Sequence, residues 1–246
     1  MRRSSGTRTA KPCFPTGWND RRLLLSGSGL PGRDEAMKTI VWDIDDVLND
    51  LTRAWFETAW RPMHPDCRLG YHELKTNPPH ELLGASKEEY LASLDRFRLS
   101  PDAASRVPDN ALVDWFRAHG DQYRHIALTA RARDTVYPAL QWLLGHFGEW
   151  FQTFGFVPSK RPGQSSGQPD RGKGDYLAWL GKADFFIDDS PDNCLAAEKL
   201  GIGSFLVAQP WNASRLTIRD ILKRLATNHP AEARPSGRKK ACKTKS

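Results

Sequence analysis

Short apolar runs alternate with longer amphipathic stretches between residues 38 and 226. Five of the runs are rich in β-branched and aromatic residues, which is typical of buried strands, and they cover residues 39–42, 124–128, 151–157, 185–187 and 204–207. The stretches between them space their apolar residues as helices do, and they predict helices at 51–60, 86–97, 110–119, 134–147, 175–180, 192–200 and 217–226. This alternation predicts an α/β fold with a doubly wound, parallel, Rossmann-like sheet.

Residues 61–108 interrupt the alternation of strands and helices. They are rich in proline and polar residues, and their clearest helical signal is Ser86 followed by Glu89, the pattern of a capping box. We therefore expect a small, mostly helical cap, inserted after the first strand over about residues 51–108. The segment 158–174 is heavy in Gly, Ser, Gln and Pro and predicts a long loop.

Two groups of carboxylates follow predicted strands that are far apart in the chain. Asp43, Asp45 and Asp46 follow the first strand, and Asp188 with Asp189 follows the fourth. Because the carboxyl ends of parallel strands meet at one edge of a sheet, we expect the two groups to converge. Carboxylates so close together repel one another unless a cation lies among them, and oxygen ligands without Cys or His favour Mg²⁺. The pattern is typical of a site for phosphate chemistry.

The acidic residues also have ordinary structural explanations. Asp43 and Asp45 are two positions apart, so both face the same side of an extended segment, where one can attack while the other moves protons. A solvated acidic loop is the alternative. Asp188 and Asp189 can serve a catalytic site, or they can cap the helix that follows them.

Two further residues gain meaning from their order in the chain. Thr129 closes the second strand and can either bind phosphate oxygens or act as a turn or cap residue. Lys173 lies in a polar loop, where a lysine is unremarkable by itself. However, the Asp pair, the Thr, the Lys and the second Asp pair all fall at or near strand ends, where open α/β sheets bind ligands. This order favours a functional site.

The segments DIDDV (43–47) and LTAR (128–131), Lys173, and FFIDDSPDN (185–193) together resemble the four motifs of the haloacid dehalogenase-like superfamily of phosphotransferases. The resemblance covers roughly residues 38–207, and the expected cap lies where that superfamily places its helical C1-type cap. The chain is most similar to the 5′(3′)-deoxyribonucleotidase-like branch, in its compact cap, its IDD-type fourth motif and the lysine before that motif. It departs from the superfamily at Asp46, where Gly is usual.

The resemblance implies roles for the motif residues. Asp43 would attack phosphorus to form an aspartyl-phosphate, and Asp45 would protonate the leaving oxygen and then activate water. Lys173 would offset the negative charge of Asp43 and the phosphate. Thr129 and Ala130 would hold the transferring phosphoryl group. Arg131 is a further substrate-binding candidate, although an arginine is not general at its position.

The resemblance also implies Mg²⁺ as the cofactor. Its ligands would be Asp43, the main-chain carbonyl of Asp45, and Asp189. Asp188 would act through water or from behind these ligands, as would Asp192 or Asn193, and the residues alone leave open which of these acids touch the metal.

These inferences predict a Mg²⁺-dependent phosphomonoester hydrolase. A 5′-nucleotidase is the first expectation for the substrate, in line with the branch that the chain resembles. Trp55, Phe56 and Trp60 could line a pocket for a base, but their helical spacing favours packing in the core. A phosphatase of sugar phosphates or other small metabolites is the second expectation. From another class, the chain could be a non-catalytic phosphate- or nucleic-acid-binding protein. The complete acid and base pair argues against that last class.

The positive charge of the chain lies near its two ends. Of the net charge of +7, residues 1–36 carry +4 and residues 228–246 carry +5, so residues 37–227 carry −2. We therefore expect at most weak nucleic-acid binding, through a basic, disordered tail at 228–246. Residues 1–36 show no apolar periodicity. We expect them to be disordered or to precede a true start at Met37, with a targeting peptide as the alternative.

The four cysteines are far apart and contain no CxxC pair, so reduced thiols are expected rather than a zinc site or disulfides. No apolar run approaches the roughly 20 residues of a membrane span. We therefore expect a soluble, cytoplasmic protein with no membrane partner.

Overall fold

The computed structural model describes residues 37–159, 161 and 170–227, and the expectations for residues 1–36 and 228–246 lie outside the described residues. Five parallel strands form one sheet in the order β3-β2-β1-β4-β5. They are β1 (Lys38–Trp42), β2 (Tyr123–Arg131), β3 (Phe151–Pro158), β4 (Phe185–Asp188) and β5 (Gly203–Leu206). The predicted parallel sheet is confirmed, and the strand order turns back at β1, the arrangement of a doubly wound fold.

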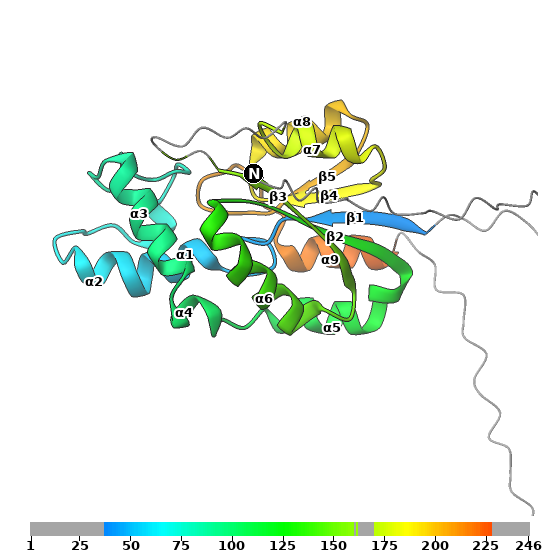
Figure 1. The fold of residues 1–246 in the computed structure, drawn as a ribbon, viewed down its shortest axis with the longest axis horizontal. Coiled ribbons are helices and arrows are strands. Elements are labelled where there is room, and N and C mark those ends of the chain that lie inside the picture. The colour runs from blue at the N-terminus through cyan, green and yellow to red at the C-terminus, as the bar shows by residue number, and fades with distance from the viewer. Residues whose placement is uncertain (1–36, 160, 162–169, 228–246) are drawn as a thin grey trace, which may run out of the picture. The chain divides into compact units, whose positions relative to one another are not determined.

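Helices cover both faces of the sheet because successive residues of β1 point to opposite sides. Ile40 and Trp42 pack in one apolar cluster with α5, α6 and α9, whereas Val41 packs in another with α7 and α8 (Figure 1). The helices are α5 (Asn110–His119), α6 (Val136–Phe147), α7 (Lys173–Leu180), α8 (Pro191–Lys199) and α9 (Ile218–Thr227). The apolar pattern of one central strand therefore fixes two layers of helices.

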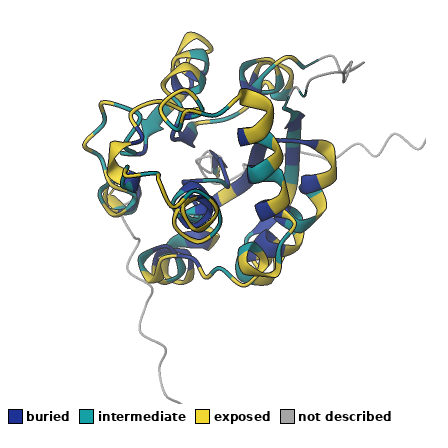
Figure 2. Ribbon diagram, turned by 90° about the vertical axis from the view of Figure 1, so that its left-hand side faces the viewer, coloured by how far each residue is buried: buried dark blue, intermediate teal, exposed yellow. Residues whose placement is uncertain are grey.

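Residues 51–104 form a group of short helices beyond the carboxyl end of β1. They are α1 (Leu51–Trp55), the π-helical turn η1 (Phe56–Trp60), α2 (Arg61–Met63), the 3₁₀ turn η2 (Tyr71–Glu73), α3 (Lys87–Arg98) and α4 (Pro101–Ala104). This group has an apolar cluster of its own, separate from those on the sheet, and Figure 2 views it end-on with its exposed residues outward. Ser86 caps α3 as predicted, because its hydroxyl accepts the Glu89 N–H at 3.1 Å. The predicted helical cap is therefore present.

The structure moves three of the predicted boundaries. The helix expected at 51–60 continues as α1, η1 and α2 to Met63. Strand β2 extends three residues beyond the predicted end, because residues 129–131 pair with residues 156–158 of β3. Lys173 is the first residue of α7 rather than part of a loop. The remaining strands and helices lie within two residues of their predicted ends. Two 3₁₀ turns, η3 (Gly120–Gln122) and η4 (Arg133–Thr135), flank β2.

Cys67 and Cys194 are free thiols, as the spacing of the cysteines predicts. Among the residues that the structure describes, no helix combines the length and the apolar character needed to cross a membrane.

A buried histidine lies at the centre of the aromatic packing below the sheet. His125 on β2 is 2% exposed. Its Nδ1 atom accepts the indole N–H of Trp42 at 3.0 Å, and its Nε2 atom lies 2.9 Å from the carbonyl oxygen of Gly120. Nδ1 can accept only when it carries no proton, so the ring is neutral and donates from Nε2. Burial lowers the pKa of His125 to about 4, even though the Gly120 contact acts in the opposite direction.

The first prediction follows from this lowered pKa. Above pH 6.5 His125 is neutral in both the folded and the unfolded chain. Between pH 6.5 and 4 only the unfolded chain binds the proton, so the free energy of unfolding should fall by about 3 kcal/mol from this residue. Urea unfolding of the wild type and of His125→Gln at pH 7.5 and 4.5 measures the difference. Gln keeps a donor and an acceptor but does not titrate, so its loss should be smaller.

His72→Gln is the matched control, because His72 is exposed. It should follow the wild type. Equal losses in the wild type and in His125→Gln would contradict the neutral, buried imidazole.

Candidate active site

The two acidic groups meet because β1 and β4 are neighbours in the sheet. Trp42 is paired with Ile187, and the Asp43 N–H donates to the Ile187 carbonyl at 2.9 Å. One carboxylate oxygen from each of Asp43, Asp188 and Asp189 lies within 4.8 Å of the others, and all three residues are buried. The predicted convergence is therefore present in the structure. We refer to these three residues as the acidic cluster.

Lys173 lies between two members of the acidic cluster. Its Nζ atom is 2.6 Å from Oδ2 of Asp43 and 2.7 Å from Oδ2 of Asp188, and its side chain is only 2% exposed. Burial alone would lower the pKa of Lys173, but Asp188 and Asp43 outweigh it and hold that pKa above its usual range. The ammonium group is therefore charged. The resemblance implies that Lys173 balances the charge of Asp43. The contact between Lys173 and Asp188 is not among the sequence predictions.

One lysine does not balance three buried carboxylates. Burial raises the pKa of Asp43 well above its usual range, and repulsion from Asp188 and Asp189 adds to it, although Lys173 acts against it. The pKa of Asp189 is raised by burial and by repulsion from Asp188 and Asp46. Buried oxygen donors with unbalanced charge are the kind of group that binds a hard divalent cation. The acidic cluster therefore fits the Mg²⁺ that the resemblance implies.

The two residues of the second acidic group are held by different partners. Oδ1 of Asp188 accepts the Ser190 N–H at 2.8 Å and the side-chain amide of Asn193 at 3.1 Å. Oδ2 of Asp189 accepts the indole N–H of Trp211 at 2.8 Å. Asn193 thus contacts the cluster through Asp188 and also lines the cavity described below, whereas Asp192 is exposed and lies outside the cluster.

Asp45 has a different environment from Asp43. Its carboxylate lies outside the acidic cluster and contacts two guanidinium groups, Arg98 Nη2 at 3.0 Å and Arg131 Nε at 2.9 Å. Burial alone would raise the pKa of Asp45, but Arg131 and Arg98 outweigh it and hold the pKa below its usual range. The structure therefore places Arg131 against Asp45, and Arg131 is not among the residues that line the cavity described next. Asp45, the predicted proton-handling residue, and Arg131, a predicted substrate-binding residue, therefore contact each other.

A cavity of about 370 Å³ opens above the acidic cluster, between the strand ends and helix α3 of the cap. Asp43, Asp45, Asp189 and Lys173 line it, together with Thr129 and Ala130. The hydroxyl oxygen of Thr129 is buried and has no hydrogen-bond partner in the described part of the chain. Such a group is costly unless a ligand pairs with it. The cavity is therefore lined by a residue whose hydroxyl lacks a partner, at the position where the resemblance implies phosphate binding.

The backbone conformation and the contacts of Asp46 explain why Asp is tolerated where Gly is usual. Its φ of 62° lies in the left-handed region, where Gly is favoured but Asp is tolerated. Its carboxylate accepts hydrogen bonds from both the N–H and the hydroxyl of Thr52. Burial raises the pKa of Asp46 to about 7, although the Thr52 hydroxyl acts against this. The side chain thus closes the loop between β1 and α1.

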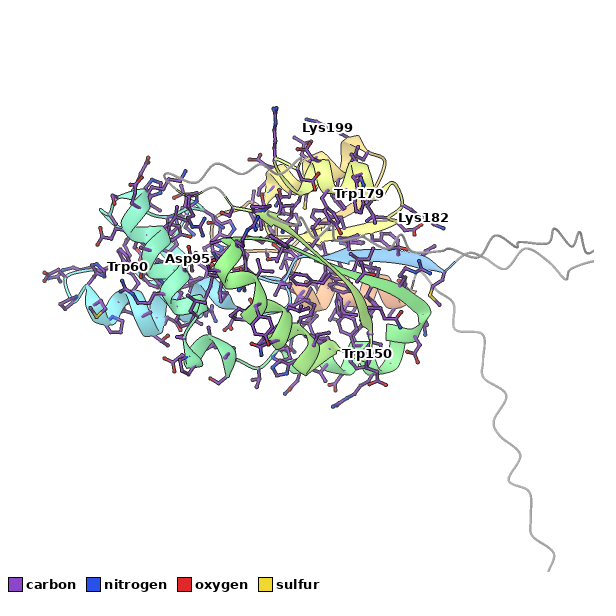
Figure 3. All side chains as sticks on the ribbon, viewed as in Figure 1. Trp60, Asp95, Trp150, Trp179, Lys182 and Lys199 are labelled. Atoms are coloured by element: carbon purple, nitrogen blue, oxygen red, sulfur yellow. The ribbon has the colours of Figure 1, made fainter. Side chains whose placement is uncertain are left out.

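The structure decides between the two interpretations of the cap aromatics, a base pocket and core packing. Trp55, Phe56 and Trp60 are buried in the apolar cluster of the cap, and none of them lines the cavity. Figure 3 labels Trp60 within the cap and Asp95 on the side of α3 nearer the sheet. The alternative of core packing holds, because the three rings pack against one another and against the cap helices.

Sequence reasoning missed three residues at the site. Arg98 contacts Asp45, Trp211 contacts Asp189, and Arg161 lines the cavity, but all three lie outside the four motifs. An arginine on a polar helix, an arginine in a loop and a tryptophan after the last strand carry no local pattern that separates them from surface residues. Only the folding of the chain brings these three residues to the site.

No family model and no curated protein matches this sequence. Solved structures do match. A hydrolase from Streptococcus pneumoniae TIGR4 shares 16% identity at a TM-score of 0.50 and covers 77% of this chain and 98% of its own.

A haloacid dehalogenase-like family hydrolase from Streptococcus pneumoniae shares 13% identity at a TM-score of 0.51, covering 78% of this chain and 99% of its own. A protein described as a haloacid dehalogenase-like hydrolase from Bacteroides fragilis shares 14% at 0.50, covering 75% and 92%. At these identities the likeness establishes the fold. The chain has the haloacid dehalogenase-like fold, with the parallel sheet and the inserted helical cap that its sequence predicts.

Proposed function

We propose that this protein is a Mg²⁺-dependent phosphomonoester hydrolase that acts through an aspartyl-phosphate on Asp43. The observation that carries the proposal is one cavity lined by Asp43 and Asp189 of the acidic cluster, by the buried Lys173, and by Thr129, whose hydroxyl has no partner among the described residues. A nucleophile, a charge-balancing cation and a donor for phosphate oxygens are the parts that phosphoryl transfer requires.

In the first step, a carboxylate oxygen of Asp43 attacks phosphorus and the bond from phosphorus to the alcohol oxygen breaks. The leaving oxygen takes a proton from Asp45. In the second step, a water oxygen attacks phosphorus, Asp45 accepts the water proton, and the bond from phosphorus to Asp43 breaks to release phosphate. Thr129 and the Ala130 amide hold the phosphoryl oxygens. When bound, Mg²⁺ supplies positive charge to the phosphoryl oxygens and the acidic cluster.

The two contacts of Asp45 suit the second step. Arg98 and Arg131 favour its ionised form, and the ionised form is the one that accepts a proton from water. For the first step Asp45 has to carry a proton, so its carboxyl group must part from at least one guanidinium group. Lys173 helps Asp43 to attack, because an ammonium group at 2.6 Å favours the ionised carboxylate despite its burial.

The substrate we propose is a small phosphomonoester without a nucleobase, such as a sugar phosphate. A nucleotide was favoured by the branch that the chain resembles and by Trp55, Phe56 and Trp60, and the structure removes the second of these supports by burying the three aromatics in the cap. On the cap side the cavity is lined instead by residues of α3 and by Asn77 and Pro78. The non-catalytic alternative depends on the basic segment 228–246, which lies outside the described residues.

Asp43→Asn should lower kcat by at least about 10³-fold on a small phosphomonoester, because an amide cannot form the phosphoryl-enzyme. Its melting temperature should stay the same or rise, since one of three repelling buried carboxylates is removed. Asp45→Asn should let the phosphoryl-enzyme accumulate, which intact-protein mass spectrometry detects. Asp192→Asn is the matched control and should keep wild-type kcat. A rate for Asp43→Asn near that of the wild type would refute the covalent mechanism.

Thr129→Val should separate stability from binding. The free energy of unfolding should change by less than about 1 kcal/mol or rise, because the hydroxyl has no partner to lose. The Kd for inorganic phosphate, measured by calorimetry with Mg²⁺, should increase about tenfold.

Thr135→Val is the matched control for this variant, because the equally buried Thr135 hydroxyl donates to the Ala132 carbonyl at 2.9 Å. It should lose about 1–3 kcal/mol of stability and retain the affinity for phosphate. The reverse pattern in the two variants would show that Thr129 has a structural role only.

Removal of the metal should abolish activity. EDTA should suppress turnover, Mg²⁺ should restore it, and Ca²⁺ should inhibit because its larger, looser coordination shell misplaces the phosphate. Independently of activity, Mg²⁺ should raise the melting temperature of the wild type and of Asp192→Asn, but not of Asp189→Asn. Full turnover in metal-free buffer, or the same stabilisation in all three proteins, would count against the assigned site.

A further inference from the structure

Five charged side chains alternate in sign from the sheet to the cap. The contacts run from Arg131 on β2 to Asp45, then to Arg98 and Asp95 on α3, and finally to Arg161 after β3. Arg98 is 3.0 Å from Asp45 and 3.1 Å from Asp95, and Arg161 is 2.7 Å from Asp95. We call these five residues the ionic chain. It connects the proposed acid and base residue to the cap.

Arg98 shares each of its two carboxylates with another guanidinium group, Asp45 with Arg131 and Asp95 with Arg161. The side chains of Arg98 and Arg161 are each 9% exposed. Charge held away from water is costly unless opposite charge balances it. The Nε atom of Arg98 is also buried and has no hydrogen-bond partner among the described residues. An anion beside Arg98 would supply a carboxylate or phosphate charge that Arg98 does not share, and an acceptor for its Nε atom.

Two of the three guanidinium groups of the ionic chain belong to residues that line the cavity. Arg98 and Arg161 line it, as does Lys87 in the first turn of α3, whereas Asp95 does not. The carboxylates that line the cavity all belong to the loops after β1 and β4: Asp43, Asp45, Asp46 and Asp189. The cap side is thus positive. Helix α3 also contributes apolar side chains to this wall, namely Tyr90, Leu91 and Leu94. Such a wall suits an organic body that carries a negative group.

We propose that Arg98, with Lys87 and Arg161, binds a second anionic group of the substrate, a carboxylate or a second phosphate on the leaving alcohol. The inference rests on the proposed function, in which Asp45 meets the leaving oxygen. Because Arg98 Nη2 lies 3.0 Å from Asp45, an anionic group a few bonds from that oxygen comes within reach of the guanidinium group. A cavity of about 370 Å³ has room for such a molecule.

A purely structural role for the ionic chain makes a different prediction. If Arg98 only held α3 against the sheet, its loss would weaken the binding of every phosphomonoester by the same factor. An anion subsite instead makes the loss selective for substrates with a second negative group. The ratio of two affinities within one variant separates the two roles, and partial loss of folded protein cancels in that ratio.

Three compounds form a matched set. Glycerol 3-phosphate has a neutral hydroxymethyl group where 3-phosphoglycerate has a carboxylate and glycerol 1,3-bisphosphate has a second phosphate ester. Their Kd values are measured by calorimetry with Mg²⁺ on the full-length Asp43→Asn protein, which does not turn them over. At least one of the two compounds with a second negative group should bind about tenfold more tightly than glycerol 3-phosphate. The compound that does so shows whether the subsite takes carboxylate or phosphate.

Adding Arg98→Met to this protein should bring the ratio of the Kd for glycerol 3-phosphate to the Kd for the preferred compound close to one. Arg98→Lys should keep part of this preference. Lys199→Gln is the control, because Lys199 lies on α8 outside the cavity (Figure 3) and should keep the full preference. Equal binding of the three compounds, or an unchanged ratio in Arg98→Met, would overturn the subsite.

The wild-type enzyme separates this result from the proposed function. Turnover of all three compounds with equal kcat/KM and equal binding would refute the subsite and leave the phosphatase standing. A binding preference that depends on Arg98, without turnover of any compound, would support the subsite and refute the phosphatase.

Discussion

The contact between Lys173 and two buried carboxylates is the interaction on which the site depends. Asp43 and Asp188 end neighbouring strands, and without an ammonium group between them they would repel each other at short range. Removing the single cation from such a buried contact would leave its carboxylates unbalanced, a change that typically costs about 3–5 kcal/mol. Lys173 reaches them because α7 packs on the sheet through Leu177, in the same apolar cluster as Phe186. The charge balance of the site therefore rests on apolar packing several residues away.

The register of the central strands makes this contact possible. Trp42 is paired with Ile187, which places the residues after them side by side. A shift of one residue in β1 would turn Ile40 and Trp42 to the wrong face of the sheet, so the apolar pattern specifies the register strongly. Trp42 is further fixed by its hydrogen bond to His125. The residues to which we assign the chemistry are thus positioned by residues to which we assign none.

The cap is connected to the chemistry through Asp45. Two cations hold this carboxylate, Arg131 from the sheet and Arg98 from the cap. A movement of the cap would therefore change the charge beside Asp45, and a ligand that engages Arg98 would do the same. Phosphoryl transfer depends mainly on positioning and charge compensation, so such a connection links substrate recognition to proton transfer. The fold alone does not establish this chemistry; the particular residues in the cavity support it.

The sequence by itself determined the parallel sheet, the inserted cap and the convergence of Asp43 with Asp188, because strand periodicity and the order of residues at strand ends are local patterns. Lys173 was also identified from its order in the chain. Only the tertiary structure decided that Asp45 contacts Arg98, and that the cap tryptophans such as Trp55 are buried rather than exposed to substrate. Those outcomes depend on how the cap packs against the sheet, between residues distant in sequence, and no periodicity within either segment encodes that packing.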